Sequence, residues 1–318
     1  MIQVHNLSKY FGPVQAVDRI TFEVDKGEIV GFLGPNGAGK TTTMRILTSY
    51  LPATSGIAKV AGYDVMTESM DVRRNIGYLP ESVPLYTEMR VDEYLVFRSK
   101  LKGVPRKERT SRIDFVMDRC RLREVRRRLL GTLSRGYRQR VGLADAMVHD
   151  PPILILDEPT AGLDPIQIRE TLALIKQLGE SHTILLSTHI LWEVEAVCER
   201  VIIINAGRIS FNRSLADVES VIHMDVRGPA DQIASTLRAT PGVAHVTPRG
   251  QDDGLASFEI RAKDDRDICE ELSKAVTDKH WLVCRLDRKQ LKLEEAFFDM
   301  FRKEDPLKEV KSSEAIKK

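Results

Sequence analysis

The sequence of 318 residues is poor in cysteine, in excess charge of either sign and in long apolar runs. Its four cysteines are Cys120, Cys198, Cys269 and Cys284, and no two of them form a CxxC pair. This spacing excludes a disulfide framework and a cysteine zinc site, and it fits a reducing compartment. The formal net charge is only +2, so no overall basic field indicates a nucleic-acid partner.

The apolar runs are too short for a membrane span. A transmembrane helix needs about 20 consecutive apolar residues. The most apolar stretches, Ile153 to Leu156 and Val201 to Ile204, contain four residues each. The N-terminal segment MIQVHNLSKYFG has neither the apolar core nor the cleavage site of a signal peptide. We therefore expect a soluble, cytoplasmic protein.

The pattern over the first two thirds of the chain predicts an α/β fold. Alternating or continuous apolar runs predict the strands, which are Ile2 to Asn6, Ile20 to Val24, Ile29 to Leu33, Gly56 to Gly62 (as an edge strand), Ile153 to Leu156 and Ile184 to Leu186. Helical patterns cover 41–51, 91–128, 165–180 and 190–199. A closing hairpin is expected at 201–211.

A composition shift near residue 212 indicates a second domain. Beyond it the pattern predicts strand, helix, strand, strand, helix and strand, at 222–227, 229–239, 243–248, 255–262, 264–278 and 281–287. This order is typical of a small ferredoxin-like α+β unit. A helix at 292–301 is expected next, so the accessory domain covers 212–302, and 303–318 form a flexible charged tail.

The segment GPNGAGKTT matches the pattern G-x-x-x-x-G-K-[ST] between a buried strand and a helix. Its glycines let backbone N–H groups close around a polyphosphate, and the helix N-terminus adds partial positive charge. We expect Lys40 to reach the β- and γ-phosphates and the Thr41 hydroxyl to ligate Mg²⁺. The alternative, an ordinary glycine turn, does not account for this context. The nucleotide-binding residues predicted here are Gly34, Pro35, Asn36, Gly37, Ala38, Gly39, Lys40, Thr41 and Thr42.

The segment PILILDE places Asp157 and Glu158 at the carboxyl end of a core strand, where ligands bind in open α/β sheets. We expect Asp157 to hold Mg²⁺ through water and Glu158 to polarise the attacking water as a general base. The alternative, a strand that ends in solvated acids, is disfavoured by the phosphate loop.

Three more segments follow a fixed order. LSRGYRQR begins at Leu133, AGLD ends at Asp164 and STH ends at His189. With the phosphate loop and the acidic strand end, they make residues 1 to about 211 resemble the ATP-binding subunit of an ABC transporter. The resemblance implies a P-loop NTPase with a RecA-like core, an antiparallel β-subdomain and a helical signature subdomain at about 83–150.

In this family the signature segment binds the γ-phosphate of ATP held by the opposite subunit. Ser134 and Gly136 match the signature, and a hydroxyl with free N–H groups at a helix start does form an anion site. Arg135 and Tyr137 depart from the family pattern. Arg135 either adds charge at this site or points away, and we favour the second.

The resemblance assigns three more residues. Asp164 belongs to the D-loop, which contacts the partner subunit. His189 is the switch histidine, which contacts the γ-phosphate, although a lone histidine at a strand end is more often structural. Phe11 aligns with the aromatic that stacks on adenine, with Tyr10 as the adjacent alternative and core packing as the other explanation.

Glu81 ends the segment NIGYLPE, where the family's Q-loop carries glutamine. Glutamine donates and accepts hydrogen bonds, whereas an ionised carboxylate only accepts. Glu81 is therefore expected either to bind Mg²⁺ more strongly or to repel the γ-phosphate. We hypothesise that it couples Mg²⁺ to the transmembrane partner.

The helical subdomain is expected to grip a short helix of that partner. The apolar residues proposed for this groove are Leu85, Met89, Tyr94 and Leu95, with core packing as the alternative for the last two. Residues 121–128 carry five arginines. They are predicted to form a solvated helix face, with contact to lipid headgroups or the membrane partner as the alternative.

The resemblance thus implies an ATPase with ATP and Mg²⁺ as cofactors. Its catalytic residues are Lys40, Glu158 and His189, and its metal ligands are Thr41, Glu81 and Asp157. Its partners are a second ATP-binding subunit, as homodimer or heterodimer, and a transmembrane permease, with no nucleic acid. The likeness to drug-resistance and gliding-motility-associated ABC-2 subunits implies export from the inner face of the membrane. The alternative is a non-transport ABC ATPase that acts as a nucleotide-gated interaction module.

Overall fold

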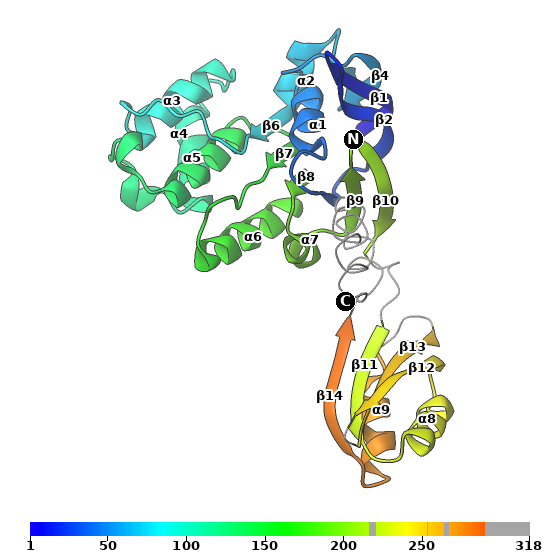
Figure 1. Cartoon of the computed structure of the whole chain (residues 1–318). Coiled ribbons are helices and arrows are strands. Elements are labelled where there is room, and N and C mark those ends of the chain that lie inside the picture. Colours follow the sequence, from blue (N-terminus) through cyan, green and yellow to red (C-terminus); the bar gives the residue numbers. More distant parts are fainter. Residues whose placement is uncertain (216–220, 253, 264–266, 290–318) are drawn as a thin grey trace, which may run out of the picture. The chain divides into compact units, whose positions relative to one another are not determined.

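The computed structural model describes residues 1–215, 221–252, 254–263 and 267–289 (Figure 1). The chain divides into two units, Met1–Leu215 and Ala216–Lys318. Strand pairing in the first unit continues to Ser214, past the predicted boundary at 211. Among the described residues, no helix is long and apolar enough to cross a membrane.

The first unit is organised around a sheet of six strands in the order β10-β9-β3-β8-β7-β6. Neighbouring strands from β9 to β6 are parallel, and β10 is antiparallel to β9. The strands are β3 (Ile29–Leu33), β6 (Ile76–Leu79), β7 (Ile153–Asp157), β8 (Thr183–Thr188), β9 (Arg200–Asn205) and β10 (Arg208–Ser214). Every residue of β3, β7 and β8 is buried, as their apolar runs predict, and this includes the polar residues at the ends of β7 and β8.

Helices cover both faces of this sheet (Figure 1). On one face Val30 and Phe32 of β3 join the core that contains α1 (Lys40–Leu47). On the other face Gly31 lies against α7 (Leu191–Val197), so closely that a Cβ at Gly31 would be 2.7 Å from a methyl carbon of Val194. α6 (Pro165–Gly179) lies on the same face, where a Cβ at Gly179 would be 2.3 Å from Cδ1 of Ile29.

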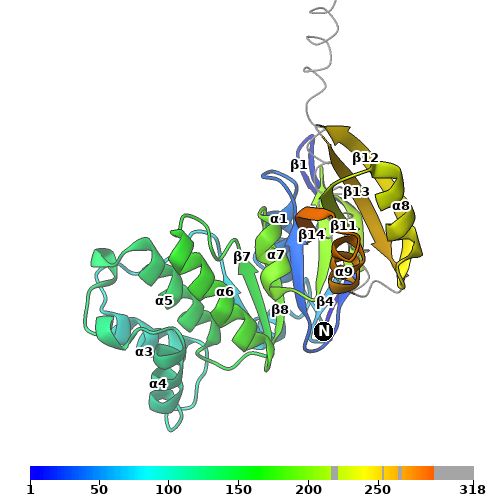
Figure 2. The same ribbon diagram turned by 90° about the horizontal axis from the view of Figure 1, so that it is seen from below.

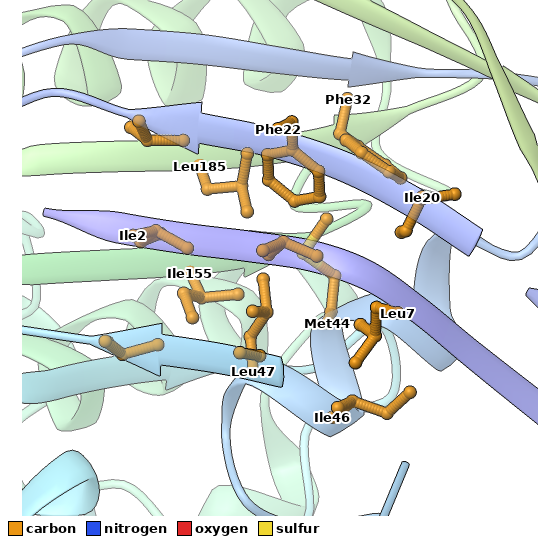
Figure 3. Packing of buried hydrophobic residues seen from close by; sticks show 14 of the residues in the cluster. Ile2, Leu7, Ile20, Phe22, Phe32, Met44, Ile46, Leu47, Ile155 and Leu185 are labelled. Atoms are coloured by element: carbon orange, nitrogen blue, oxygen red, sulfur yellow. The ribbon is translucent and has the colours of Figure 1, made fainter. Parts of the chain in front are cut away.

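A second sheet, antiparallel and ordered β2-β1-β4-β5, packs over α1. Its strands are β1 (Ile2–Phe11), β2 (Val14–Val24), β4 (Ser55–Val60) and β5 (Tyr63–Asp64). The prediction that residues 56–62 form an edge strand is therefore wrong, because β5 pairs with the side of β4 that faces away from β1. Figure 3 shows the core between the two sheets, which includes Ile2, Leu7, Ile20, Phe22, Phe32, Met44, Ile46, Leu47, Ile155 and Leu185.

Three helices, α3 (Val91–Leu101), α4 (Arg109–Arg119) and α5 (Arg135–Met147), pack together beside the central sheet (Figures 1 and 2). The prediction that residues 121–128 form a helix face is wrong. Left-handed backbone at Arg121 (φ 53°) separates α4 from a 3₁₀ turn, η1 (Arg123–Val125). Three of the segment's five arginines make ion pairs, Arg121 with Glu170, Arg123 with Asp118 and Arg126 with Asp92. These arginine side chains stay solvent-exposed, so the segment is charged surface but not one helix face.

One other helix prediction needs correction, and one helix was not predicted. α1 ends at Leu47 rather than at residue 51, because Ser49 adopts left-handed backbone (φ 55°) and Pro52 follows. A short helix, α2 (Ser69–Asn75), precedes β6 and was not predicted. The 3₁₀ turn η2 (Leu130–Thr132) leads into α5.

The second unit has the predicted β-α-β-β-α-β order. Its elements are β11 (Val221–Arg227), α8 (Ala230–Ala239), β12 (Val243–Asp252), β13 (Leu255–Ala262), α9 (Cys269–Thr277) and β14 (Leu282–Lys289). The strands form one antiparallel sheet, β12-β13-β11-β14, and both helices contribute to its single core. The helix expected at 292–301 and the tail at 303–318 lie outside the described residues.

Candidate functional site

Four neighbouring parallel strands end at the same edge of the central sheet. The phosphate loop follows β3, His189 follows β8, Asp157 ends β7, and Glu81 lies just beyond β6. Loops at the carboxyl ends of parallel strands form the ligand sites of open α/β sheets. The topology therefore brings four segments that are distant in sequence to one edge.

The phosphate loop requires its glycines. Gly39 has a φ of 107°, and a Cβ there would lie 2.5 Å from the carbonyl oxygen of Ala16. At Gly34 a Cβ would lie 2.2 Å from the carbonyl oxygen of Ile204. The loop then opens directly into α1, whose first turn carries no acidic side chain, so its N–H groups and dipole remain available to an anion.

Lys40 is buried at the start of α1. Its Nζ donates hydrogen bonds to the carbonyl oxygens of Gly34, at 2.7 Å, and Pro35, at 3.1 Å. The same Nζ lies 3.2 Å from Oε1 of Glu158, a contact that is an ion pair rather than a directed hydrogen bond. Lys40 thus connects the phosphate loop with the acidic end of β7.

Asp157 is fully buried and has one carboxylate oxygen in use. Oδ1 accepts hydrogen bonds from Ser187 Oγ, at 2.5 Å, and Thr41 Oγ1, at 3.2 Å. Oδ2 is buried and has no hydrogen-bond partner among the described residues. Burial raises the pKa of this carboxyl, and the charges of Glu158 and Glu81 add to the rise, against the two hydroxyl donors. A buried oxygen with this surplus negative potential fits a cation such as Mg²⁺.

Glu158 has left-handed backbone, with a φ of 48°, which is uncommon for a residue with a side chain. Its N–H donates to the carbonyl oxygen and to Oγ of Ser187, both at 3.1 Å. Its Oε2 lies 2.9 Å from Nδ1 of His189. The carboxylate is therefore held between His189 on one oxygen and Lys40 on the other.

Ser187 is a site residue whose role was not predicted from the sequence. It is buried at the end of β8, donates to Asp157 and accepts from the N–H of Glu158. The signal was a polar pair, Ser187 and Thr188, that ends an apolar strand. Thr188 donates to the buried Glu193, at 2.6 Å, and supports the turn that carries His189.

The signature segment lies apart from this cluster. Ser134 caps α5 and accepts from the N–H of Tyr137 at 3.4 Å. Gly136 lies against Gln167 of α6, where a Cβ would be 2.3 Å from Oε1. Throughout 1–215, no hydrogen bond or ion pair links Ser134 or Gly136 to Lys40.

The D-loop packs on the same segment. The Arg135 guanidinium lies against Gly162, so that a Cβ at Gly162 would be 2.4 Å from its Cζ. Arg135 thus turns toward the D-loop. Asp164 caps α6, with Oδ1 accepting from the N–H groups of Ile166, at 3.0 Å, and Gln167, at 2.9 Å.

The residues predicted to stack on adenine are exposed, whereas two of those predicted to form the groove for the membrane partner are buried. Phe11 and Tyr10 are exposed at the end of β1. Tyr94 and Leu95 are buried in the helical subdomain, so their assignment to an exposed groove is wrong and core packing explains them. Tyr86 is exposed beside Tyr94, with ring centroids 6.1 Å apart.

The fold and this edge of the sheet define a P-loop ATPase. Residues 17–161 match the family described as ABC transporter. The chain is 37% identical over 219 residues to the uncharacterized ABC transporter ATP-binding protein YxlF of Bacillus subtilis, covering 69% of this chain and 72% of that protein. It is 30% identical over 307 residues to the linearmycin resistance ATP-binding protein LnrL of the same organism, covering 94% and 98%.

A solved structure to which the chain is similar is also an ABC transporter cassette. The dimeric structure of MJ0796, a bacterial ABC transporter cassette, matches with a TM-score of 0.62 and 25% identity, covering 67% of this chain and 98% of that one. The chain therefore belongs to the ATP-binding proteins of the ABC transporter family, and it is an ATPase.

Proposed function

We propose that this ATPase powers export of a substrate through a separate membrane permease. The observation that carries the ATP-driven part of the proposal is the contact series Lys40–Glu158–His189 beside Asp157, at the ends of adjacent parallel strands. The likeness to LnrL, whose name states linearmycin resistance, supports export. The proposed location is the cytoplasmic face of the membrane, where the permease holds the chain.

ATP binding would begin at the phosphate loop. Its backbone N–H groups and the N-terminus of α1 receive the phosphates, and Phe11 offers an exposed ring for adenine. Lys40 then exchanges the carbonyl oxygens of Gly34 and Pro35 for the β- and γ-phosphates. Because Lys40 also pairs with Glu158, this exchange frees the carboxylate.

Asp157 and Thr41 would hold Mg²⁺, with Glu81 at the adjacent strand end. The unpartnered Oδ2 of Asp157 is the oxygen that suits this role. When bound, Mg²⁺ neutralises charge on the β- and γ-phosphates. Ser187 fixes the other oxygen of Asp157 and so orients the carboxylate.

Hydrolysis would use Glu158 as the group that polarises the attacking water. Nδ1 of His189 holds Oε2 of Glu158, and Ser187 holds the backbone N–H of Glu158. These contacts fix the carboxylate in one orientation. His189 is half-exposed, so its ring remains accessible to the γ-phosphate.

The site would be completed by a second subunit. Ser134 and Gly136 lie outside the Lys40 cluster, and the cap position leaves N–H groups of the first turn of α5 available to a phosphate. Two chains related by a two-fold axis would each supply this segment, and Asp164, to the partner's ATP. The MJ0796 cassette is dimeric, which supports a homodimer or heterodimer.

The mass of Glu158→Gln in solution, with and without ATP and Mg²⁺, tests the shared site. The variant binds ATP without cleaving it, so ATP should convert monomer to dimer. Glu180→Gln, an exposed acid at the end of α6, is the matched control and should hydrolyse ATP normally. A dimer with or without ATP would assign dimerisation to another surface, and an ATP-bound monomer would contradict the shared site.

Export requires a separate test. The chain should co-purify with a permease from membranes, and the pair in inverted vesicles should accumulate substrate inside only with ATP. ATPase activity without any permease association would favour the alternative, a nucleotide-gated interaction module.

A further inference from the structure

A cavity of about 60 Å³ lies where the end of α4 meets α5 and α6. None of the residues assigned to the ATPase site lines it. A cavity needs about 15 Å³ to hold a water molecule, so this one has room for about four waters or for one tetrahedral oxyanion. We name it the α4–α6 cavity.

The charged groups of the α4–α6 cavity favour an anion. Arg119, Arg121 and Arg140 line it together with one acid, Glu170, which leaves a net charge of +2. Glu170 already accepts from Arg121, at 2.9 Å, and from Arg140. Arg119 lies near the ring of Phe115, at 5.5 Å, and has no ion pair in the part of the chain that the structure describes. Its guanidinium is therefore available to a ligand.

Gln139 supplies an independent observation. This lining residue is 5% exposed, and its Nε2 is buried without a hydrogen-bond partner among the described residues. An amide NH₂ group only donates, so the atom that it lacks is an acceptor. Buried donors in folded proteins are almost always satisfied, by protein, water or ligand. The buried donor thus lacks an acceptor, and the exposed guanidinium of Arg119 favours an acceptor that carries negative charge.

The apolar residues and the cysteine that line the α4–α6 cavity add no negative charge that would repel an anion. Leu79, Leu143 and Leu174 are apolar, and a low local dielectric strengthens charge-assisted hydrogen bonds. Cys120 also lines the cavity, and burial raises the pKa of its thiol to about 12. The thiol therefore stays neutral and adds no negative charge.

We infer that the α4–α6 cavity binds a phosphate group, held by Arg119 and the amide of Gln139. Free inorganic phosphate, which is a product of this ATPase, fits a cavity of this volume. The bound group joins the helical subdomain, through α4 and α5, to α6, which begins at the D-loop. The site thus lies where an anion can restrain the subdomain that carries Ser134.

Titration calorimetry of the full chain with inorganic phosphate tests this inference. The phosphate loop is first filled with Mg²⁺ and a non-hydrolysable ATP analogue, so that the titration does not report on that loop. One phosphate should bind per chain. Gln139→Leu and Arg119→Gln should each weaken binding at least tenfold, whereas Arg123→Gln, whose arginine pairs with Asp118 outside the cavity, should leave it unchanged.

A parallel titration with glycerol 2-phosphate distinguishes the sources of the group. Weaker binding than inorganic phosphate supports the free anion, and tighter binding supports the phosphate site but assigns it to a monoester. The thermal unfolding midpoint of each variant confirms that it is folded. If Gln139→Leu is unstable, Arg119→Gln alone tests the site, because Arg119 is exposed and its replacement does not disturb the core. Absence of phosphate binding, or equal binding by the wild type and both variants, overturns the inference while the analogue's own affinity still reports the ATPase site.

Discussion

Nζ of Lys40 and Oε1 of Glu158 lie 3.2 Å apart, and both side chains are more than nine-tenths buried. The lysine that should bind phosphate and the acid that should polarise water are therefore paired with each other in this arrangement. Removal of one partner from such a pair leaves an uncompensated buried charge, which costs more than the pair itself contributes. The pair couples the phosphate loop to the end of β7.

Lys40→Met should destabilise the fold and weaken ATP binding. We expect a loss of about 3 kcal/mol in the free energy of unfolding, because Glu158 loses its cation. ATP affinity should fall about 10- to 100-fold, because the variant loses one charge-assisted hydrogen bond to the phosphates. Denaturant unfolding and nucleotide titration measure the two effects.

The double variant Lys40→Met/Glu158→Gln is the control for this pair. Since the buried charge is then absent, it should be less destabilised than the sum of the single variants. Additive losses would show that the two side chains do not interact.

Ser187→Ala should lower activity while leaving the fold largely intact. Asp157 loses the donor at 2.5 Å from its Oδ1, and the N–H of Glu158 loses one of its two acceptors. We expect about tenfold lower kcat, a higher Mg²⁺ requirement and about 1 kcal/mol less stability. Steady-state ATPase assays across Mg²⁺ concentrations measure this.

Ser181→Ala is the matched control, because Ser181 hydrogen-bonds near the end of α6, to Leu178 and His182, rather than at the site. An unchanged Mg²⁺ requirement in Ser187→Ala would contradict the orienting role of Ser187.

Gly39→Ala and Gly37→Ala should differ in stability although both glycines lie in the phosphate loop. Both have left-handed backbone, which costs a residue with a Cβ about 1 kcal/mol. At Gly37 a Cβ meets open space, whereas at Gly39 it lies 2.5 Å from the Ala16 carbonyl oxygen. Gly39→Ala should therefore lose a further 2 kcal/mol or so and bind ATP much more weakly. Equal losses in chemical denaturation would exclude the steric explanation.

Some of the site was predictable from sequence and some was not. Lys40 and Asp157 were predictable because a strand–loop–helix pattern and an apolar strand fix their positions along the chain. Ser187 was missed because its role depends on pairing between β7 and β8, which no local pattern encodes. Tyr94 and Leu95 were assigned to a surface because composition does not tell which side of a helix faces its neighbours.

Parts of the fold were likewise predictable from sequence, and other parts were not. The ferredoxin-like order of the second unit was predictable from strand and helix lengths. The break of the arginine-rich segment after α4 was not, since it depends on left-handed backbone at Arg121. Nothing in the local sequence marks that residue as different from its neighbours.

His149 makes the stability of the first unit depend on pH. Burial, with a smaller contribution from the charge of Lys102, lowers the pKa of His149 to about 4. The ring stays neutral and lies 3.0 Å, through Nε2, from the carbonyl oxygen of Ile76. The unfolded chain takes up a proton near pH 6.5, and the folded chain does so only near pH 4. Stability is therefore full above pH 6.5 and falls as the pH drops toward 4.

His149→Gln removes this titration and keeps an N–H group for Ile76. Between pH 7 and pH 5, the wild type should lose about 2 kcal/mol more free energy of unfolding than the variant. His280→Gln, outside the first unit, is the control and should follow the wild type. Urea unfolding at both pH values measures the difference, and parallel pH profiles for the wild type and His149→Gln would show that His149 is not kept neutral by burial.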